Sequence, residues 1–598
     1  MKGVAFFLFL MTSAACFAQS SIEGYILDKS TNEPLPFATI NLIKSGKYTI
    51  TNEDGKFEIK NTFANDSLRV THIGYESVKI PLSYFLTNFK LFMVPFISEL
   101  DEITVVADKD YAYKLLNHLI RKYRNKESVS ESKAFLSLTS SANNTPLEHI
   151  EGFYNSKQSL SDGIIDLKIK SGRFGQNKSF PFYSLDNTTI LRGFQLFKST
   201  NHQILPFYPG NITFSSIKRK YIVKVATCIS CSEGDISISF IPKRLNGRLF
   251  FGKILFNKET LIIKKIELGI KDPVINELSS IIKKDVITFK EIQLNILFNP
   301  IDLERIQYLD FTMIMYYNFG NSIEIIKSDS FLYFYDYDNS FEEPYFTSAI
   351  HFNNDYDKII ALQATDDFWD SNYQFPKSYN ENNSLDFMKK FGYLINYNST
   401  IPSNYIELTK PSVISWSKEK RLEWKNVKQT LATDNEITNR TNIGYTATIK
   451  KDKMSLSVTP LHNKNPYSGD YEKLNFSYML DLLKNKNGSR QFITRTIFDR
   501  NSSFYSSGHT KNKLVYLNLI FDIYEYHRQS LMTQITDKMT FEKSKNLCKK
   551  KFVEASMTVE KMKNETNSGK NYQSLTKWNT LIKSKLNIDN FALITNNQ

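Results

Sequence analysis

The histidines and their neighbours are the residues that would carry metal-dependent peptidase chemistry. A zinc carboxypeptidase needs a His-x-x-Glu motif and a distant histidine, because two imidazoles and a carboxylate hold the metal with one position open for water. The sequence has eight histidines, which are His72, His118, His149, His202, His351, His462, His509 and His527. None is followed by glutamate three residues later, and no His-Glu-x-x-His motif occurs. The sequence therefore predicts no zinc peptidase.

Other catalytic and cofactor motifs are also absent from the sequence. It contains no Gly-x-Ser-x-Gly elbow, no Walker loop and no Gly-x-Gly-x-x-Gly fingerprint. The segment DYDNSFEE at 336–343 begins like a calcium loop with Asp336 and Asp338. However, Phe341 stands where that loop needs glycine, and Thr347 stands where it needs a bidentate glutamate. We therefore predict neither a cofactor nor a metal site.

Paired carboxylates leave one hydrolase hypothesis open. Asp366-Asp367 lies beside Trp369, and Glu342-Glu343 precedes Pro344. A glycosidase needs two carboxyl groups ~5 Å or more apart, a separation that a sequence does not define. A pocket with converging carboxylates of shifted pKa would favour a hydrolase that uses Asp366 or Asp367. The other interpretation is that such pairs cap strands or meet lysines, and we expect no enzyme.

The aromatic residues beside the first acidic pair are a candidate binding surface. Phe368, Trp369 and Tyr373 fall within six residues in the segment ATDDFWDSNYQFP at 364–376. Exposed rings of this kind would contact a glycan or a protein partner. The alternative is that the same rings seal the β-rich part of the chain.

The cysteines predict a local crosslink. Cys228 and Cys231 form the motif CISC, which resembles a redox or zinc half-site, but a structural zinc site needs four ligands and no second pair occurs. In an oxidising compartment we expect a Cys228–Cys231 disulfide at a hairpin tip. Cys548 is expected to be a small apolar residue on a helix face.

The first residues predict export. Lys2 provides a positive charge, Val4–Met11 an apolar core, and the small residues before Gln19 a cleavage site, so we expect a signal peptide over 1–18. The alternative is lipidation of Cys16. Both place the protein in the periplasm or in association with the outer membrane. No later segment reaches ~18 uninterrupted apolar residues, so we predict no transmembrane helix.

Composition is that of a folded, lysine-rich chain. The 598 residues are 41% hydrophobic and 14% aromatic, which is sufficient for packed cores. The formal charge is +14, yet no run of five basic residues occurs. We therefore predict a solvated basic surface and no nucleic-acid partner.

Residues 19–107 are predicted to form a β-sandwich. Short segments rich in β-branched and aromatic residues alternate with turn residues, which is typical of this architecture. In KFEIK, Phe57 and Ile59 alternate with charged residues, and Asp54-Gly55 predicts a β-hairpin just before them. Gly74 predicts a bend.

This region resembles the carboxypeptidase-regulatory-like domain of Bacteroidota envelope proteins. The resemblance is carried by IEGYILDKSTNEPLPFATINL, TNEDGKFEI, LRVTHIGYESVKI and LDEITVVA. It implies a transthyretin-like β-sandwich and an envelope location, but no particular activity. The rest of the chain is similar to exported proteins in which this sandwich precedes a body of unknown function, on the basis of residues 364–376 and 565–589.

Beyond the sandwich we expect four further regions. Helical periodicity predicts a connector helix in 108–130, and alternating segments predict a β-rich body over 131–376. Residues 377–510 are a mixed segment with a loop or linker near 377–405. Residues 511–590 carry three apolar stripes of helical spacing, which predict three packed helices with His527 and Cys548 in their core.

The expected fold class is mainly β with α: an N-terminal transthyretin-like β-sandwich, a β-rich middle body and a C-terminal helical segment. We expect a non-enzymatic exported envelope protein that binds or scaffolds an envelope protein or a glycan, with peripheral membrane association. One alternative is an outer-membrane-associated component that works with a barrel or transport partner. The other is the hydrolase described above.

Overall fold

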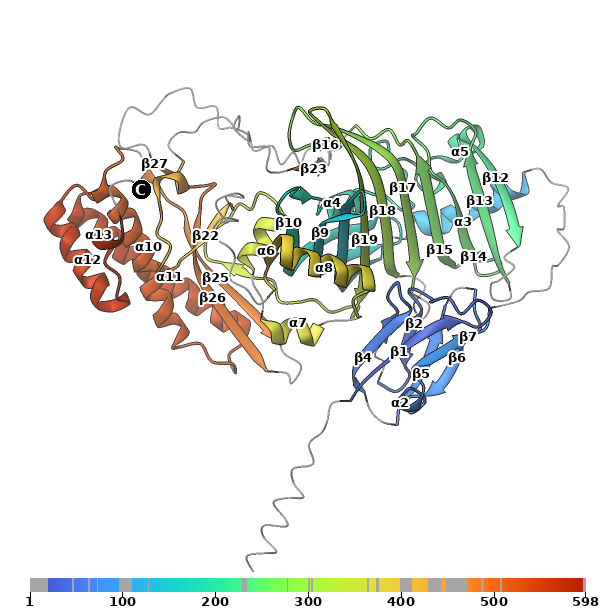
Figure 1. Ribbon diagram of the computed structural model, residues 1–598, viewed down its shortest axis with the longest axis horizontal. Helices are drawn as coiled ribbons and strands as arrows, with labels where there is room; N and C mark the ends of the chain where they lie inside the picture. The colour runs from blue at the N-terminus through green and yellow to red at the C-terminus, as the bar shows by residue number, and fades with distance from the viewer. Residues whose placement is uncertain are drawn as a thin grey trace, which may run out of the picture.

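The computed structural model divides into three units along the chain (Figure 1). A small β-sandwich comes first, a large curved sheet follows, and a unit of helices on a short sheet completes the chain. The structure describes residues 20–594 apart from 46–47, 63–64, 73, 96–109, 127, 186, 228–233, 277, 300–301, 303–304, 363–364, 373–375, 398–410, 429–442, 448–471, 485–488 and 506–507.

The N-terminal unit is a sandwich of a three-stranded and a four-stranded sheet. The first sheet has the order β4 (Lys56–Thr62), β1 (Ser20–Asp28), β7 (Lys90–Met93). The second has the order β3 (Tyr48–Ile50), β2 (Thr39–Leu42), β5 (Ser67–Thr71), β6 (Val78–Pro81). Helix α2 (Tyr84–Thr87) closes one end. The alternating apolar residues, such as Phe57 and Ile59, point into one shared core, as the period of two predicts.

The predicted hairpin at Asp54-Gly55 is wrong. The chain does reverse there, with Gly55 at a φ of 70°, but β3 and β4 on either side belong to different sheets. Strand β4 pairs with β1 instead. The Asn52 side chain accepts hydrogen bonds from the backbone N–H of Asp54 (3.0 Å) and Lys56 (2.8 Å), which fixes the turn as a corner between the two sheets. Turn residues determine where a chain reverses, and not which strands pair.

The central unit is an eleven-stranded sheet in which all neighbours are antiparallel. The long strand β19 pairs with β8, so the last long strand of the unit lies beside the first. In spatial order the strands are β12 (Tyr221–Thr227), β13 (Asp235–Pro242), β14 (Phe251–Asn257), β15 (Ile263–Lys271), β17 (Val286–Phe298), β18 (Ile306–Phe319), β19 (Ser322–Tyr335), β8 (Val129–Ala142), β9 (Thr145–Ser159), β10 (Gly163–Asn177) and β21 (Gly392–Ile395).

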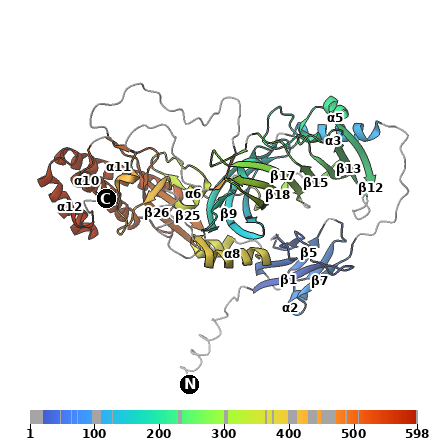
Figure 2. The same cartoon turned by 45° about the horizontal axis from the view of Figure 1, so that its top comes forward.

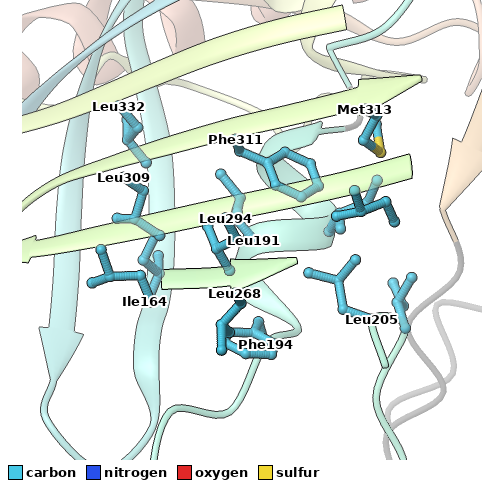
Figure 3. Packing of buried hydrophobic residues seen from close by; sticks show 14 of the residues in the cluster. Ile164, Leu191, Phe194, Leu205, Leu268, Leu294, Leu309, Phe311, Met313 and Leu332 are labelled. Carbon is cyan, nitrogen blue, oxygen red and sulfur yellow. The ribbon is translucent and has the colours of Figure 1, made fainter. Parts of the chain in front are cut away.

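One face of this sheet, here called the inner face, is covered by the chain itself. Between β11 (Phe182–Tyr183) and β12, the chain crosses the face through α4 (Asn187–Arg192), η1 (Pro209–Asn211) and α5 (Phe214–Lys220). Leu191, Phe194 and Leu205 from this crossing pack with Leu294 and Phe311 from the strands (Figure 3). The inner face is therefore a filled hydrophobic core.

Helix α3 (Tyr111–Arg124) lies in the stretch where the sequence predicts a connector helix. Its stripe of Leu116, Leu119, Ile120 and Tyr123 is buried in the core of the inner face. The Tyr123 hydroxyl also accepts a hydrogen bond from the N–H of Ile263 (3.0 Å). The connector is therefore an integral part of the central unit.

The C-terminal unit packs helices on a four-stranded sheet of order β20 (Tyr345–Phe346), β25 (Phe476–Lys484), β26 (Arg490–Asp499), β22 (Val413–Ser415). The three predicted helices are α10 (Lys511–Met532), α11 (Phe541–Thr566) and α12 (Tyr572–Leu586), and a short α13 (Asn590–Leu593) follows. Cys548 is fully buried, whereas His527 is half-buried, with Nε2 3.1 Å from the Thr558 hydroxyl. Because one core unites helices and sheet, the helical region does not stand apart from residues 377–510.

The predicted loop or linker near 377–405 is wrong for most of the residues that the structure describes there. Helix α8 (Tyr379–Phe391) and strand β21 occupy 379–395. A capping box begins the helix: the Ser378 hydroxyl accepts from the N–H of Glu381, whose side chain accepts from the N–H of Ser378. The many asparagines of this stretch favour a loop, but the Ser-x-x-Glu pattern at 378–381 is a helix start signal that outweighs them. Helices α6 (Asp355–Ala361) and α7 (Asp366–Asn372) precede it.

Five short elements complete the described secondary structure. Strands β16 (Leu278–Ser280) and β23 (Ile443–Ala447) form a small sheet with β11. Strands β24 (Glu472–Lys473) and β27 (Phe504–Tyr505) pair with each other, and η2 (Trp424–Asn426) lies nearby in the C-terminal unit.

Candidate functional site

The outer face of the large sheet carries rows of side chains set by the strand register. Ser137 of β8 lies opposite Phe331 of β19, which lies opposite Asp310 of β18. In the next row Thr139 lies opposite Asp329. Because side chains at i and i+2 share a face, these residues form one continuous and largely polar surface.

This polar surface is the floor of a cavity of about 590 Å³. One wall comes from the sandwich through Phe37, Asn52 and Glu53, and another wall is the start of α8 with its N-cap, from Ser378 to Ser384. Figure 2 shows the sandwich and α8 next to each other on the same side of the sheet. The remaining lining residues are Ser140, Ser141, Asn144, Pro146, Lys327 and Ser330. Four distant stretches of the chain therefore build one concave site.

An aromatic contact holds the sandwich on the sheet beside the cavity. The Phe37 ring stacks on the Phe331 ring, with centroids 4.5 Å apart, and lies 5.4 Å from the Tyr308 ring. Phe37 adopts a left-handed backbone with a φ of 61°, which is unfavourable for a bulky residue by ~1–2 kcal/mol. Gln307 also donates a buried hydrogen bond of 2.9 Å to the Thr39 hydroxyl. Buried contacts thus fix the first wall against the floor.

The corner at Asp54-Gly55 joins the two walls. The backbone N–H of Tyr379, at the start of α8, donates a hydrogen bond of 2.7 Å to the Asp54 carboxylate. Ser137 on the floor donates to the Glu381 carboxylate. The carboxylate of Glu381 therefore sits between the helix start and the sheet, and Asp54 ties the sandwich to the same helix end.

Carboxylates dominate the electrostatics of the cavity. Its described lining includes four carboxylates, those of Glu53, Asp310, Asp329 and Glu381, and one basic side chain, that of Lys327. Burial raises the pKa of Asp310, and the nearby Asp329 raises it further. Glu53 keeps contact with solvent at the rim, but partial desolvation followed by the charges of Glu381, Asp329 and Asp54 raises its pKa as well.

A buried ionic network lies on the same face next to α8. Glu151 accepts from Arg173 (2.7 Å), contacts the Lys377 ammonium at 3.0 Å and accepts from the Tyr397 hydroxyl (2.8 Å). Burial alone would raise the pKa of Glu151, but Lys377, Arg173 and His149 together hold it well below its usual range. This carboxylate is fully compensated by cations, in contrast to those of the cavity.

The structure corrects the predicted aromatic surface for two of its three rings. Phe368 and Trp369 are 1% and 4% exposed, and they pack with Phe153 of the large sheet. Arg173 lies over the Trp369 ring at 4.1 Å from its centroid. The two rings seal α7 onto the sheet, which was the alternative interpretation. Tyr373 lies outside the described residues.

The acidic pairs singled out from the sequence do not line the cavity. Asp366 and Asp367 are exposed in the first turn of α7. Glu343 pairs with Lys168 at 2.9 Å, which is the surface role expected of such pairs. In the calcium-like segment, Asp336 pairs with Lys133 and Asp338 with Arg305. The exposed positions of Asp366 and Asp367, outside the cavity, therefore do not support a hydrolase that uses either residue.

Of the cysteines for which the sequence makes predictions, the structure describes only Cys548. Cys16, Cys228 and Cys231 lie outside the described residues. Burial raises the pKa of the Cys548 thiol to about 12, so it remains protonated and unreactive at neutral pH.

A serine, a histidine and an aspartate do meet in the C-terminal unit, but not as a catalytic relay. The Ser502 hydroxyl lies 2.9 Å from His351 Nδ1, and the Asp499 carboxylate lies 3.5 Å from the same nitrogen. A Ser-His-Asp triad needs the serine and the aspartate on opposite ring nitrogens. In the described ranges, no group of three or more His, Cys, Asp or Glu side chains is arranged to hold a metal ion.

Sequence reasoning did not identify the cavity residues. Its floor and walls come from four stretches separated by long intervals, and nothing local links Glu53 to Asp310 or Glu381. The available signal was the alternation in AFLSLTSSA at 134–142, where Ser137, Thr139 and Ser141 place polar groups on one face of a long strand. Such a face predicts solvent or a polar site, and does not distinguish between them.

Comparison with known proteins identifies the first unit only. Residues 22–105 match the family model described as the CarboxypepD_reg-like domain. No curated protein matches the chain. Within the part of the chain that the structure describes, no helix is long and apolar enough to cross a membrane.

Two solved structures align with part of the chain. The crystal structure of MucB covers 37% of this chain and 92% of its own, at 8% identity and a TM-score of 0.15. The crystal structure of MucB in complex with MucA(peri) covers 37% and 93%, at 7% identity and a TM-score of 0.15. A TM-score this low carries no inference about fold or function.

Proposed function

We propose that this protein is a non-enzymatic, exported envelope protein that binds a partner in the cavity between its CarboxypepD_reg-like domain and its large sheet. The domain at 22–105 is of a non-catalytic, regulatory or binding type. The observation that carries the proposal is that this domain forms one wall of a cavity with polar lining. Its size falls in the range of ~300–1,000 Å³ typical of ligand sites.

The way in which the domain is attached supports this proposal. A domain that moves independently typically has a hydrated, polar interface with its neighbour. Here Phe37 and Ile50 of the sandwich instead pack against a cluster of buried aromatic rings on the sheet. The domain therefore contributes a fixed surface. A preformed site of this kind loses little conformational entropy when a ligand binds.

Blocking the cavity tests the binding role. Asn383 is an exposed residue on the α8 wall, and Asn383→Trp would fill the space without disturbing a core. Asp386→Trp on the same helix lies outside the lining and serves as the matched control. Loss of binding to a panel of envelope glycans and peptides in the first variant, with binding retained in the second, is the expected result. Equal binding by both variants would contradict the proposal.

Export and attachment require a separate experiment in native envelopes. Salt, carbonate and detergent washes, with protease shaving of intact cells, would place the protein in the periplasm or at the outer membrane. Release by salt or carbonate is expected for a peripheral protein. Retention until detergent would favour lipidation or a membrane-inserted partner, and Cys16→Ser would separate these two.

A hydrolase is the second candidate function, because Asp310 and Glu53 combine a raised pKa with positions in one cavity. A carboxyl group whose pKa is raised is better suited to act as a general acid than one at its ordinary value. Turnover of chromogenic glycosides or peptides that is abolished by Asp310→Asn would establish this function. We expect no turnover.

A further inference from the structure

We infer that the cavity takes a basic peptide segment, with a lysine ammonium or arginine guanidinium placed among Glu53, Asp310, Asp329 and Glu381. This inference rests on the proposed binding function and names the chemistry of the ligand. It follows from the charge balance of the cavity, from one unpaired amide in its wall and from the arrangement of its aromatic rings.

The cavity holds an excess of negative charge on a protein that is otherwise basic. Four carboxylates and one basic residue, Lys327, are among its described lining residues. The whole chain, in contrast, carries a formal charge of +14. Lys327 already pairs with Asp329 at 2.8 Å. Among the described residues, no lysine or arginine lies within ion-pair distance of Glu53, Asp310 or Glu381. An arriving cation would therefore find three carboxylates that have no direct ion-pair partner among the described residues.

The network around Glu151 provides an internal comparison on the same face of the sheet. There the chain supplies Arg173 and Lys377 to one buried carboxylate. In the cavity, by contrast, only Asp329 has an ion-pair partner among the described residues, and two of the other carboxylates accept hydrogen bonds from neutral side chains: Asp310 from Asn295, at 3.1 Å, and Glu381 from Ser137. The chain thus neutralises one acidic site itself and leaves the neighbouring site to a ligand.

Asn52 adds a second, independent indication of a ligand. Its side chain is 4% exposed and lines the cavity, and its Oδ1 is used by the turn at Asp54. Within the part of the chain that the structure describes, its Nδ2 has no hydrogen-bond partner. A buried amide donor without a partner is costly unless a ligand oxygen accepts from it. A peptide carbonyl next to a basic side chain would satisfy this donor and the carboxylates together.

The aromatic rings favour a peptide over a sugar. Phe37 and Phe331 both line the cavity, but they stack on each other with their planes 9° apart. Their contacting faces therefore cover each other, whereas sugar binding commonly uses an open ring face. A single metal ion is also a poor fit, because the described carboxylates are not gathered into a group that could coordinate one.

Proton linkage gives the inference a readout apart from affinity. The charged groups that face the site are Glu53 and Asp54 from the sandwich, Lys265 from β15, Asp310 from β18, Lys327 and Asp329 from β19, and Glu381 from α8. A bound cation would lower the raised pKa values of Glu53 and Asp310. Binding should therefore release protons and weaken as the pH falls toward those values.

The experiment is isothermal titration of the full chain with the peptide acetyl-Lys-Lys-amide in buffers of different ionisation enthalpy. Spermidine, which lacks a carbonyl, and a glucosamine trimer are the comparison ligands. We expect saturable 1:1 binding of the peptide, proton release, and weaker binding of spermidine. The Glu53→Gln/Asp310→Asn double variant should bind about ten-fold more weakly or worse. Asp386→Asn, on the outer side of α8, should bind like the parent.

The outcomes separate the inference from the proposed function. Binding of the glucosamine trimer or of a neutral glycan in place of the peptide, blocked by Asn383→Trp, would overturn the peptide inference and support the binding function. Peptide binding that the double variant leaves unchanged would also overturn the inference. If no ligand of any class binds in a way that Asn383→Trp abolishes, both are overturned.

Discussion

Phe37 of the sandwich and Phe331 of the large sheet stack with their ring centroids 4.5 Å apart, and this contact is the centre of the junction between the two units. The same two rings line the cavity. The geometry of the site therefore depends on how firmly the first domain is held.

The first prediction concerns this contact. Phe37→Ala removes the stacked ring and should destabilise the junction by about 1–3 kcal/mol, because the ring is only partly buried. Hydrogen exchange should increase in β18 and β19 and in the turn at Asp54, without global unfolding. Phe89→Ala, which changes a sandwich ring that is 62% exposed, is the control and should leave exchange unchanged. Equal effects from the two variants would show that the ring does not hold the junction.

The second prediction concerns pH and Asp310. Because the pKa of Asp310 is raised in the folded protein, its contribution to stability is fully present below the ordinary aspartate pKa of ~3.9 and is lost as the pH rises through the folded value. Asp310→Asn cannot ionise, so its melting temperature should exceed that of the parent at neutral pH and match it in acid. Asp272→Asn, whose side chain is 74% exposed, should show no such gain. A parent and an Asp310→Asn variant with parallel pH profiles would refute the assignment.

The third prediction has the opposite sign and concerns Glu151. Its pKa is held well below the usual glutamate range, so the stability it provides is present above ~pH 4.3 and is lost as the pH falls through the folded value. Glu151→Gln leaves Arg173 and Lys377 without their shared partner and should cost about 3–5 kcal/mol in urea unfolding at neutral pH. Glu131→Gln, at an exposed ion pair with Lys157, should cost less than ~1 kcal/mol.

The fourth prediction tests the buried pair that joins the central and C-terminal units. Lys170 and Asp481 are 1% and 4% exposed and form an ion pair between β10 and β25. Burial lowers the pKa of Lys170 and raises that of Asp481, and each partner opposes the shift of the other. Asp481→Leu alone should cost about 3–5 kcal/mol, and Lys170→Met with Asp481→Leu should recover most of that loss. If the double variant is no more stable than the single one, the pair provides more than charge compensation.

The sequence was most informative where a local pattern defines one element. The alternation of Phe57 and Ile59 predicted a strand with one buried face, and the stripe of Leu116, Leu119 and Ile120 predicted a helix; both are present. These patterns depend on neighbours within a few residues, so a single chain reveals them.

Pairings and sites that depend on distant residues could not be derived in this way. The Asp54-Gly55 pair predicts a hairpin, and the chain does reverse there, but the strands on either side pair in different sheets. The sequence left two interpretations of Trp369, an exposed binding ring or a ring that seals the sheet, and only its packing against Phe153 of β9 shows the second. The carboxylates of the cavity share no local motif, because they are brought together only when the sandwich, β18, β19 and α8 have all assembled.

The pairing of β19 with β8 has a consequence for how the chain folds. Lys133 and Asp336, which form an ion pair at the end of this pairing, are separated by 203 residues. Closing so long a loop is entropically costly and makes folding slow. One edge of β8 therefore stays unpaired until β19 has been synthesised and has reached it. An exposed edge of this length attracts other chains. We therefore expect refolding to be slow and concentration-sensitive, and premature truncation before β19 to yield aggregates.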